Sequence, residues 1–131
     1  MTLGNKKLGA KGEAIAVSFL QSAGYRIVER NYRVRLGEID IIAEEGGYLV
    51  FIEVKTRTDN RYGSPFESVT QQKQKQLSKV ALEYMNKLEC HDRPARFDVV
   101  AVLLQGEKKT VSRDAGIEIM RNAFDLCYDN G

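Results

Sequence analysis

The sequence is poor in the residues that carry several common kinds of site. Among 131 residues there are one histidine and two cysteines, Cys90 and Cys127, whose spacing matches no metal-binding motif. A histidine-rich zinc site, a histidine-based nuclease and a Ser-His-Asp hydrolase are therefore poor explanations of this chain. Two cysteines far apart in the sequence favour free cytosolic thiols over a disulfide.

Long apolar runs are also missing. The first 13 residues, MTLGNKKLGAKGE, lack the apolar core of a signal peptide, and no apolar run approaches the length of a membrane span. The sequence therefore predicts a cytoplasmic protein without a membrane segment. The formal net charge is only +2, so an argument for nucleic acid must come from local clusters of basic residues.

What is present suits one globular domain over residues 1–131. The chain is long enough for one sizeable core, and 43% apolar with 29% charged residues is ordinary for a soluble domain. Periodicity and composition predict helices over residues 5–23 and 66–88, and strands within 25–36, 37–57, 96–104 and 117–126. This order predicts an α/β fold with a mixed central sheet flanked by helices.

The chain is organised around a hairpin at residues 37–57, GEIDIIAEEGGYLVFIEVKTR. Gly46 and Gly47 suit a two-residue turn, because both central positions of such a turn need φ > 0. Counting outwards from this turn pairs Ile41 with Ile52, Asp40 with Glu53, and Ile39 with Val54. One face of the hairpin then carries Ile39, Ile41, Ala43, Val50, Ile52 and Val54. The other carries Glu38, Asp40, Ile42, Leu49, Phe51, Glu53 and Lys55.

This register predicts a metal site. Asp40 and Glu53 would face each other as like charges, which destabilises a sheet unless something neutralises them. A divalent cation does so, since Mg²⁺ binds carboxylate oxygens and keeps several waters for substrate. With Lys55 on the same face, the group can hold a phosphate and orient a water for phosphodiester hydrolysis. The alternative is two exposed strand faces whose charges keep the hairpin soluble.

Two further acidic residues need an interpretation. Glu13 lies at the margin of the apolar stripe of helix 5–23, where it either reaches water or, if the helix packs beside the polar face of the hairpin, becomes a third carboxylate. Asp98 lies inside the apolar run of residues 96–104, RFDVVAVLL. We interpret Asp98 as structural, paired with an arginine.

Basic residues cluster immediately before the hairpin. Within ten residues lie Arg26, Arg30, Arg33 and Arg35, with Tyr32 between them. Such a cluster suits phosphate contacts and base stacking. The alternative is a solvated edge strand whose charges prevent pairing between sheets.

Basic residues also follow the hairpin. Arg57 precedes a polar loop, residues 58–65, that leaves the strand where it could cover a substrate. Lys73 lies in the first turns of helix 66–88, and helix N-termini favour phosphate. A solvated helix face is the other explanation of Lys73 and its polar neighbours.

Four motifs taken together resemble a known family. GEIDIIA, FIEVKTR, an N-terminal GxxGE helix and a late RFDVV strand look like the YraN-like family of bacterial proteins. That family is similar to archaeal Holliday junction resolvases within the PD-(D/E)xK nuclease superfamily. The resemblance runs from Gly9 to about Phe124 and implies a restriction-endonuclease-like fold. Ile39 stands where the superfamily often has proline.

The resemblance also implies roles for four residues. Asp40, Glu53 and Lys55 match the catalytic core, and Glu13 matches the helix-borne acid of the resolvases. Asp40 and Glu53, helped by the Val54 carbonyl, would hold Mg²⁺ or Mn²⁺, and Glu13 would hold a second metal or a water. A homodimer is implied by the resemblance alone, because resolving branched DNA requires two cuts.

The sequence thus predicts a metal-dependent DNA endonuclease, with selectivity for branched DNA left open. The residues expected to contact the DNA backbone are Arg30, Arg33, Arg35, Arg57 and Lys73. Two alternatives from other classes remain: a nucleic-acid-binding module of the same fold without turnover, and an assembly protein that docks an acidic partner.

Overall fold

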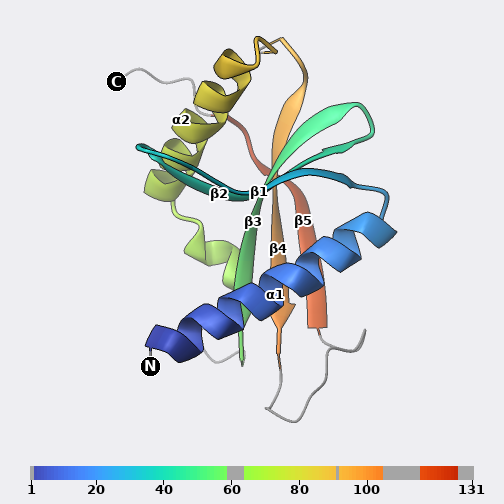
Figure 1. Cartoon of the computed structure of the whole chain (residues 1–131), viewed down its shortest axis with the longest axis vertical. Coiled ribbons are helices and arrows are strands. Elements are labelled where there is room, and N and C mark those ends of the chain that lie inside the picture. Colours follow the sequence, from blue (N-terminus) through green and yellow to red (C-terminus); the bar gives the residue numbers. More distant parts are fainter. Residues whose placement is uncertain (1, 59–63, 91, 105–115, 127–131) are drawn as a thin grey trace.

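A computed structural model describes residues 2–58, 64–90, 92–104 and 116–126. The elements, in chain order, are α1 (Thr2–Ser22), β1 (Arg26–Val34), β2 (Gly37–Glu45), β3 (Tyr48–Arg57), the 3₁₀ helix η1 (Pro65–Ser68), α2 (Gln71–Lys87), β4 (Ala95–Leu103) and β5 (Gly116–Phe124) (Figure 1). This confirms the predicted order of helices and strands. Most of the loop expected to cover a substrate, with Cys127, lies outside the described residues.

The five strands form one mixed sheet in the order β1-β2-β3-β4-β5. Neighbouring strands are antiparallel except β3 and β4, which are parallel. A parallel pair needs a crossover connection, and η1 and α2 lie within the chain that joins β3 to β4. The α/β prediction is confirmed, and the architecture is consistent with a restriction-endonuclease-like fold.

Each face of the sheet has its own apolar core. One core contains Ile15, Ala16 and Leu20 of α1, packed with Ile41, Val50, Ile52 and Val100 of the strands. The other contains Leu77, Val80, Tyr84 and Met85 of α2, packed with Ile42, Phe51, Phe97 and Val99. In Figure 1, α1 runs obliquely across β3, β4 and β5. The sheet is therefore buried between the two helices, which suits its apolar strands.

The hairpin turn forms as predicted, but the pairing of its strands stops early. Gly46 and Gly47 have φ values of 61° and 86°, as a two-residue turn requires. The ladder between β2 and β3 ends at the pair Ile41–Ile52. The predicted opposition of Asp40 to Glu53, and of Ile39 to Val54, is therefore wrong.

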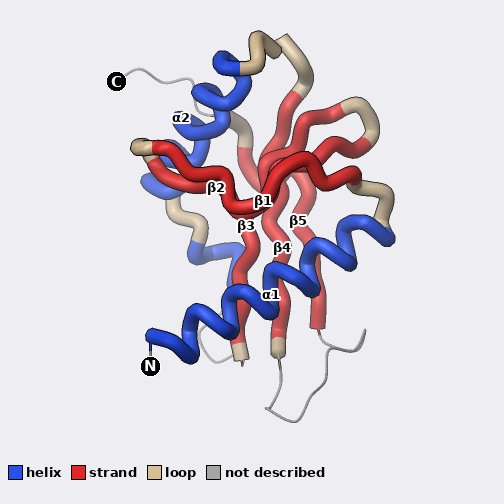
Figure 2. Tube along the Cα trace, in the orientation of Figure 1, coloured by secondary structure: helices blue, strands red, loops and turns tan. Residues whose placement is uncertain are grey.

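The two strands separate because each follows a different partner. Before Ile41, β2 pairs only with β1, whereas after Ile52, β3 pairs only with β4. Figure 2 shows β1 and β2 curving away from the direction of β3, β4 and β5. The predicted face of Ile39 is also wrong, since Ile39 is buried in the α2 core and not beside Ile41.

The second helix begins later than the predicted residue 66. Pro65–Ser68 form η1, and the side chain of Thr70 then caps α2 by accepting a hydrogen bond from the Lys73 backbone N–H at 3.2 Å. Lys73 consequently lies in the first turn of α2.

A close approach fixes α1 against β3. Gly12 is buried where α1 crosses the sheet, and a Cβ atom there would lie 2.9 Å from the Cβ of Thr56. Because no side chain fits this gap, Gly12 sets how near the neighbouring Glu13 comes to the hairpin.

The contact predicts that Gly12→Ala destabilises the protein by about 1–3 kcal/mol, the usual range for overpacking. Gly9→Ala is the matched control, since a Cβ at Gly9 meets nothing within 4 Å. Better helix propensity should make that variant as stable as wild type or up to about 1 kcal/mol more stable. Urea melts of both variants measure the difference, and equal effects would contradict the close packing of α1.

Candidate active site

Asp40 lies at the point where β2 and β3 separate. Its Oδ2 accepts a hydrogen bond from the Val54 backbone N–H at 2.8 Å. Val54 lies just beyond the last β2–β3 pair, so the carboxylate takes the place of a strand partner for this N–H. The side chain of Asp40 is thereby held between the separating strands.

The acidity of Asp40 reflects its surroundings. Burial and then the negative charge of Glu53 raise the pKa of Asp40 to about 7. Glu13 and Glu38 add to the rise, and the Val54 hydrogen bond opposes it. Among the described residues no basic side chain forms an ion pair with Asp40. Glu53 is thus close enough to disfavour the charge of Asp40, although the two residues are not paired across the ladder.

Glu53 is balanced by two lysines. Its residue is only 8% exposed, and its Oε2 lies 3.3 Å from Lys55 Nζ and 3.8 Å from Lys73 Nζ. Lys55 is two residues further along β3, and Lys73 comes from the first turn of α2. The structure therefore brings together Asp40, Glu53, Lys55 and Lys73, although Lys73 was expected only at the DNA backbone.

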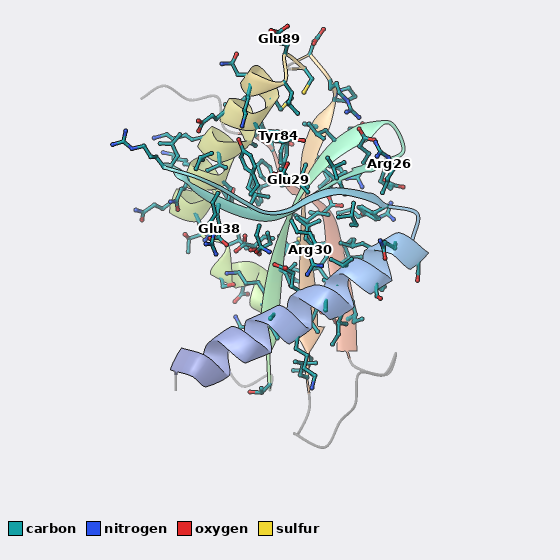
Figure 3. All side chains as sticks on the ribbon, viewed as in Figure 1. Arg26, Glu29, Arg30, Glu38, Tyr84 and Glu89 are labelled. Atoms are coloured by element: carbon teal, nitrogen blue, oxygen red, sulfur yellow. The ribbon has the colours of Figure 1, made fainter. Side chains whose placement is uncertain are left out.

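Glu13 joins this group from α1. Its side chain is 14% exposed, and its Oε1 accepts hydrogen bonds from Arg30 Nη2 at 3.0 Å and Asn31 Nδ2 at 3.2 Å. Figure 3 shows Arg30 on the part of β1 that passes α1. The condition that α1 packs beside the acidic part of the hairpin is met, and Glu13 does not simply extend into water. Arg30, one of the residues expected to contact DNA, forms an ion pair with this third carboxylate.

The other three residues expected to contact DNA lie at separate places. Arg33 is exposed and pairs with Glu38 at 3.1 Å. Arg35 is also exposed and lines an open groove with Leu36 and Lys79 of α2. Arg57 borders a cavity of about 90 Å³ beside Lys55 at the ends of β3 and β4.

Two residues of the site were missed by sequence reasoning. Asn31 donates to Glu13 and has a φ of 54°, in the left-handed region. Glu38 adds negative charge near Asp40. Glu38 could have been found from the sequence, because it lies on the same predicted polar face as Asp40. Nothing local in the sequence indicates the left-handed backbone of Asn31.

Asp98 belongs to a separate buried cluster. It is fully buried and accepts hydrogen bonds from Tyr25 Oη at 2.7 Å, Arg96 Nε at 2.9 Å and the Asn122 N–H at 2.9 Å. Burial and the bond to Asp98 raise the pKa of Tyr25 to about 12. The structural interpretation of Asp98, with an arginine partner, is confirmed.

Among the described residues, no group of three or more His, Cys, Asp or Glu side chains is gathered closely enough to enclose a metal. In the same part of the chain, no helix has the length and apolar character needed to cross a membrane.

Comparison with known proteins places the chain among bacterial relatives. The profile of the uncharacterised protein family UPF0102 matches residues 12–102. A UPF0102 protein of Geobacter metallireducens is 48% identical over 128 residues, covering 98% of this chain and all of the relative. One from Pelobacter propionicus is 49% identical, covering 95% and 86%, and one from Clostridium botulinum is 44% identical, covering 93% and 97%.

The site predicts that Asp40→Asn stabilises the metal-free protein at high pH. Asparagine can still accept the Val54 bond but removes a negative charge beside Glu53. Because the pKa of folded Asp40, about 7, lies above the ordinary value of 3.8, its protonation favours folding at acidic pH, and this contribution is lost as the pH rises through 7. The variant should therefore gain about 0.5–2 kcal/mol near pH 8 and almost nothing near pH 4.

Thermal melts in EDTA across this pH range measure the gain, with Asp92→Asn as an exposed control. Wild type should be stabilised by added Mn²⁺, and the Asp40 variant should lose most of that response. A variant that melts below wild type at pH 8, with its Mn²⁺ response intact, would end the assignment of Asp40 as a ligand.

Proposed function

The chain belongs to the uncharacterised protein family UPF0102, and from its site we propose that it is a metal-dependent DNA endonuclease that hydrolyses phosphodiester bonds in the cytoplasm. The observation that carries the proposal is the group formed by Asp40, Glu53 and Lys55. Asp40 and Glu53 are largely buried and lie close together, and the pKa of Asp40 is raised to about 7. The Nζ atom of Lys55 lies 3.3 Å from Glu53 Oε2. Such perturbed acids are typical of functional sites.

The donor atoms fit Mg²⁺ or Mn²⁺. Carboxylate and carbonyl oxygens are the ligands that these hard ions prefer, and Mg²⁺ commonly binds through one or two carboxylates while keeping several waters. Asp40, Glu53 and the Val54 carbonyl would hold the ion, and Glu13 would hold a second ion or a water. A group of three acidic side chains is therefore not required. The charge of the ion would favour the ionised form of Asp40, which burial and the negative charge of Glu53 otherwise disfavour.

When bound, the ion would make a coordinated water more acidic and stabilise negative charge on the phosphate. The protein's own residues supply the rest of the chemistry. Lys55, held by Glu53, would orient the attacking water and offset the charge that builds on the phosphate oxygens. Lys73 would contact a neighbouring phosphate from the first turn of α2, where the N–H groups of the helix also favour an anion.

A second set of basic residues, on β1, in the β1–β2 connection and at the end of β3, supports DNA as the substrate. Arg33, Arg35 and Arg57 would contact the sugar–phosphate backbone, which dominates affinity for nucleic acid. Arg30 would contribute only after leaving Glu13. A module that merely binds DNA, or one that docks an acidic partner, gains nothing from buried carboxylates beside these cations. Incubation with DNA substrates distinguishes those two alternatives from a nuclease.

The proposal predicts that Lys55→Met greatly slows cleavage without abolishing metal binding. The carboxylates remain, so Mn²⁺ should bind as tightly as in wild type or more tightly, while cleavage falls by about 10²–10³-fold. Wild type and variant should be incubated with linear, flapped and four-way-junction DNA in Mg²⁺, Mn²⁺ or EDTA, and Mn²⁺ binding should be measured by calorimetry without DNA.

Lys87→Met is the matched control, because Lys87 is an exposed lysine in the last turn of α2, fourteen residues beyond Lys73. It should cut like wild type. Cleavage that persists in EDTA would exclude the metal mechanism. Wild-type protein that binds DNA in a salt-sensitive way but cuts none of the substrates would favour the binding module instead, and wild type that binds no DNA would favour the assembly protein.

A second prediction concerns the exposed arginines. Replacing Arg33 and Arg35 together with alanine should weaken DNA binding and reduce the slope of log K against log salt by roughly one for each lost phosphate contact. Fluorescence anisotropy over a salt series measures the slope. An unchanged slope would mean that the two arginines lie at a sheet edge without contacting phosphate, as where Arg33 pairs with Glu38.

A further inference from the structure

The position of the Glu13 carboxylate is set by two consecutive residues of β1. Both Arg30 and Asn31 donate to the same oxygen, Oε1, at 3.0 and 3.2 Å. The two donors differ in character. The Arg30 side chain is long and 45% exposed, whereas the Asn31 amide is attached to the backbone by a single methylene and has little freedom to move.

Asn31 has an unusual backbone for a strand residue. Its φ of 54° lies in the left-handed region, although it stands in the middle of β1. Asparagine tolerates this conformation better than most residues, and strained backbone of this kind gathers at functional sites. The ladder pairs Arg30 with Ile41 and Tyr32 with Ile39, so Asn31 lies beside Asp40 across the strands.

We propose that Asn31 is a positioning residue, and that its left-handed backbone serves to aim its amide at Glu13. The amide fixes one oxygen of Glu13 at the edge of the acidic group, which orients the carboxylate toward Asp40. Glu13 reaches the site from α1 and Asn31 from β1, so the bond also ties the two elements together there. This role rests on the proposed function, because Glu13 is taken to act beside the metal.

Asn31→Gly separates the backbone from the amide. Glycine adopts positive φ freely, so relief of strain offsets the lost hydrogen bond, and the melting temperature should stay within about 3 °C of wild type. The donor to Glu13 is nevertheless gone. Affinity for Mn²⁺, or the cleavage rate, should therefore fall by about 10–100-fold, the usual effect of losing a residue that orients a metal ligand.

Asn122→Gly is the matched control. Asn122 also has a positive φ, 52°, but it lies on β5, and its contact with Asp98 uses the backbone N–H, which glycine keeps. This variant should melt about 1–4 °C higher than wild type with unchanged Mn²⁺ affinity and cleavage.

Glu13→Ala, alone and combined with Asn31→Gly, completes the set. Because Asn31 acts through Glu13, the double variant should lose no more Mn²⁺ affinity or cleavage than Glu13→Ala alone.

The results distinguish a failure of the positioning role of Asn31 from a failure of the proposed nuclease function. If wild type binds Mn²⁺ and cuts DNA but Asn31→Gly does both equally well, the positioning role is overturned. If wild type does neither, the proposed function fails, and melts in EDTA then decide the role of Asn31. A different melting shift for Asn31→Gly in the presence and absence of Glu13 supports the contact, whereas equal shifts overturn it.

Discussion

The candidate site depends on one hydrogen bond, from the Val54 N–H to Asp40. A strand that leaves its neighbour exposes backbone groups that must find other partners. Here β2 leaves β3 after the pair Ile41–Ile52, and the carboxylate of Asp40 accepts a bond that a β2 carbonyl would have accepted. The separation thus creates space between the strands and, in the same step, places an acid inside it.

The acids in this space create an imbalance of charge that the protein corrects only in part. Lys55 and Lys73 neutralise Glu53, whereas burial and the nearby acids raise the pKa of Asp40 to about 7. A fold selected for stability alone would gain by replacing one acid with a neutral residue. Under the proposed function a cation would complete the group, so the same two acids would govern both the activity and the stability of the protein.

The third acid requires a different kind of support, because it comes from a separate layer. Gly12 lets α1 lie directly against Thr56 of β3, and Glu13 then meets donors from β1. The position of Glu13 therefore depends on the close packing of α1 as well as on hydrogen bonds. The buried cluster around Asp98 performs a structural task elsewhere, joining Tyr25, β4 and β5.

The sequence by itself determined the features that depend on neighbouring residues. The Gly46-Gly47 turn, the register near it and the apolar run of β4 follow from turn chemistry and a period of two, which are local. The α/β class followed from the order of these elements. The motifs made Glu13, Asp40, Glu53 and Lys55 the candidate residues. Only the tertiary structure decided where β2 leaves β3, which core receives Ile39, and that Arg30 meets Glu13. These features depend on which distant segments pair and pack, because a strand can curve away only where its other neighbour holds it.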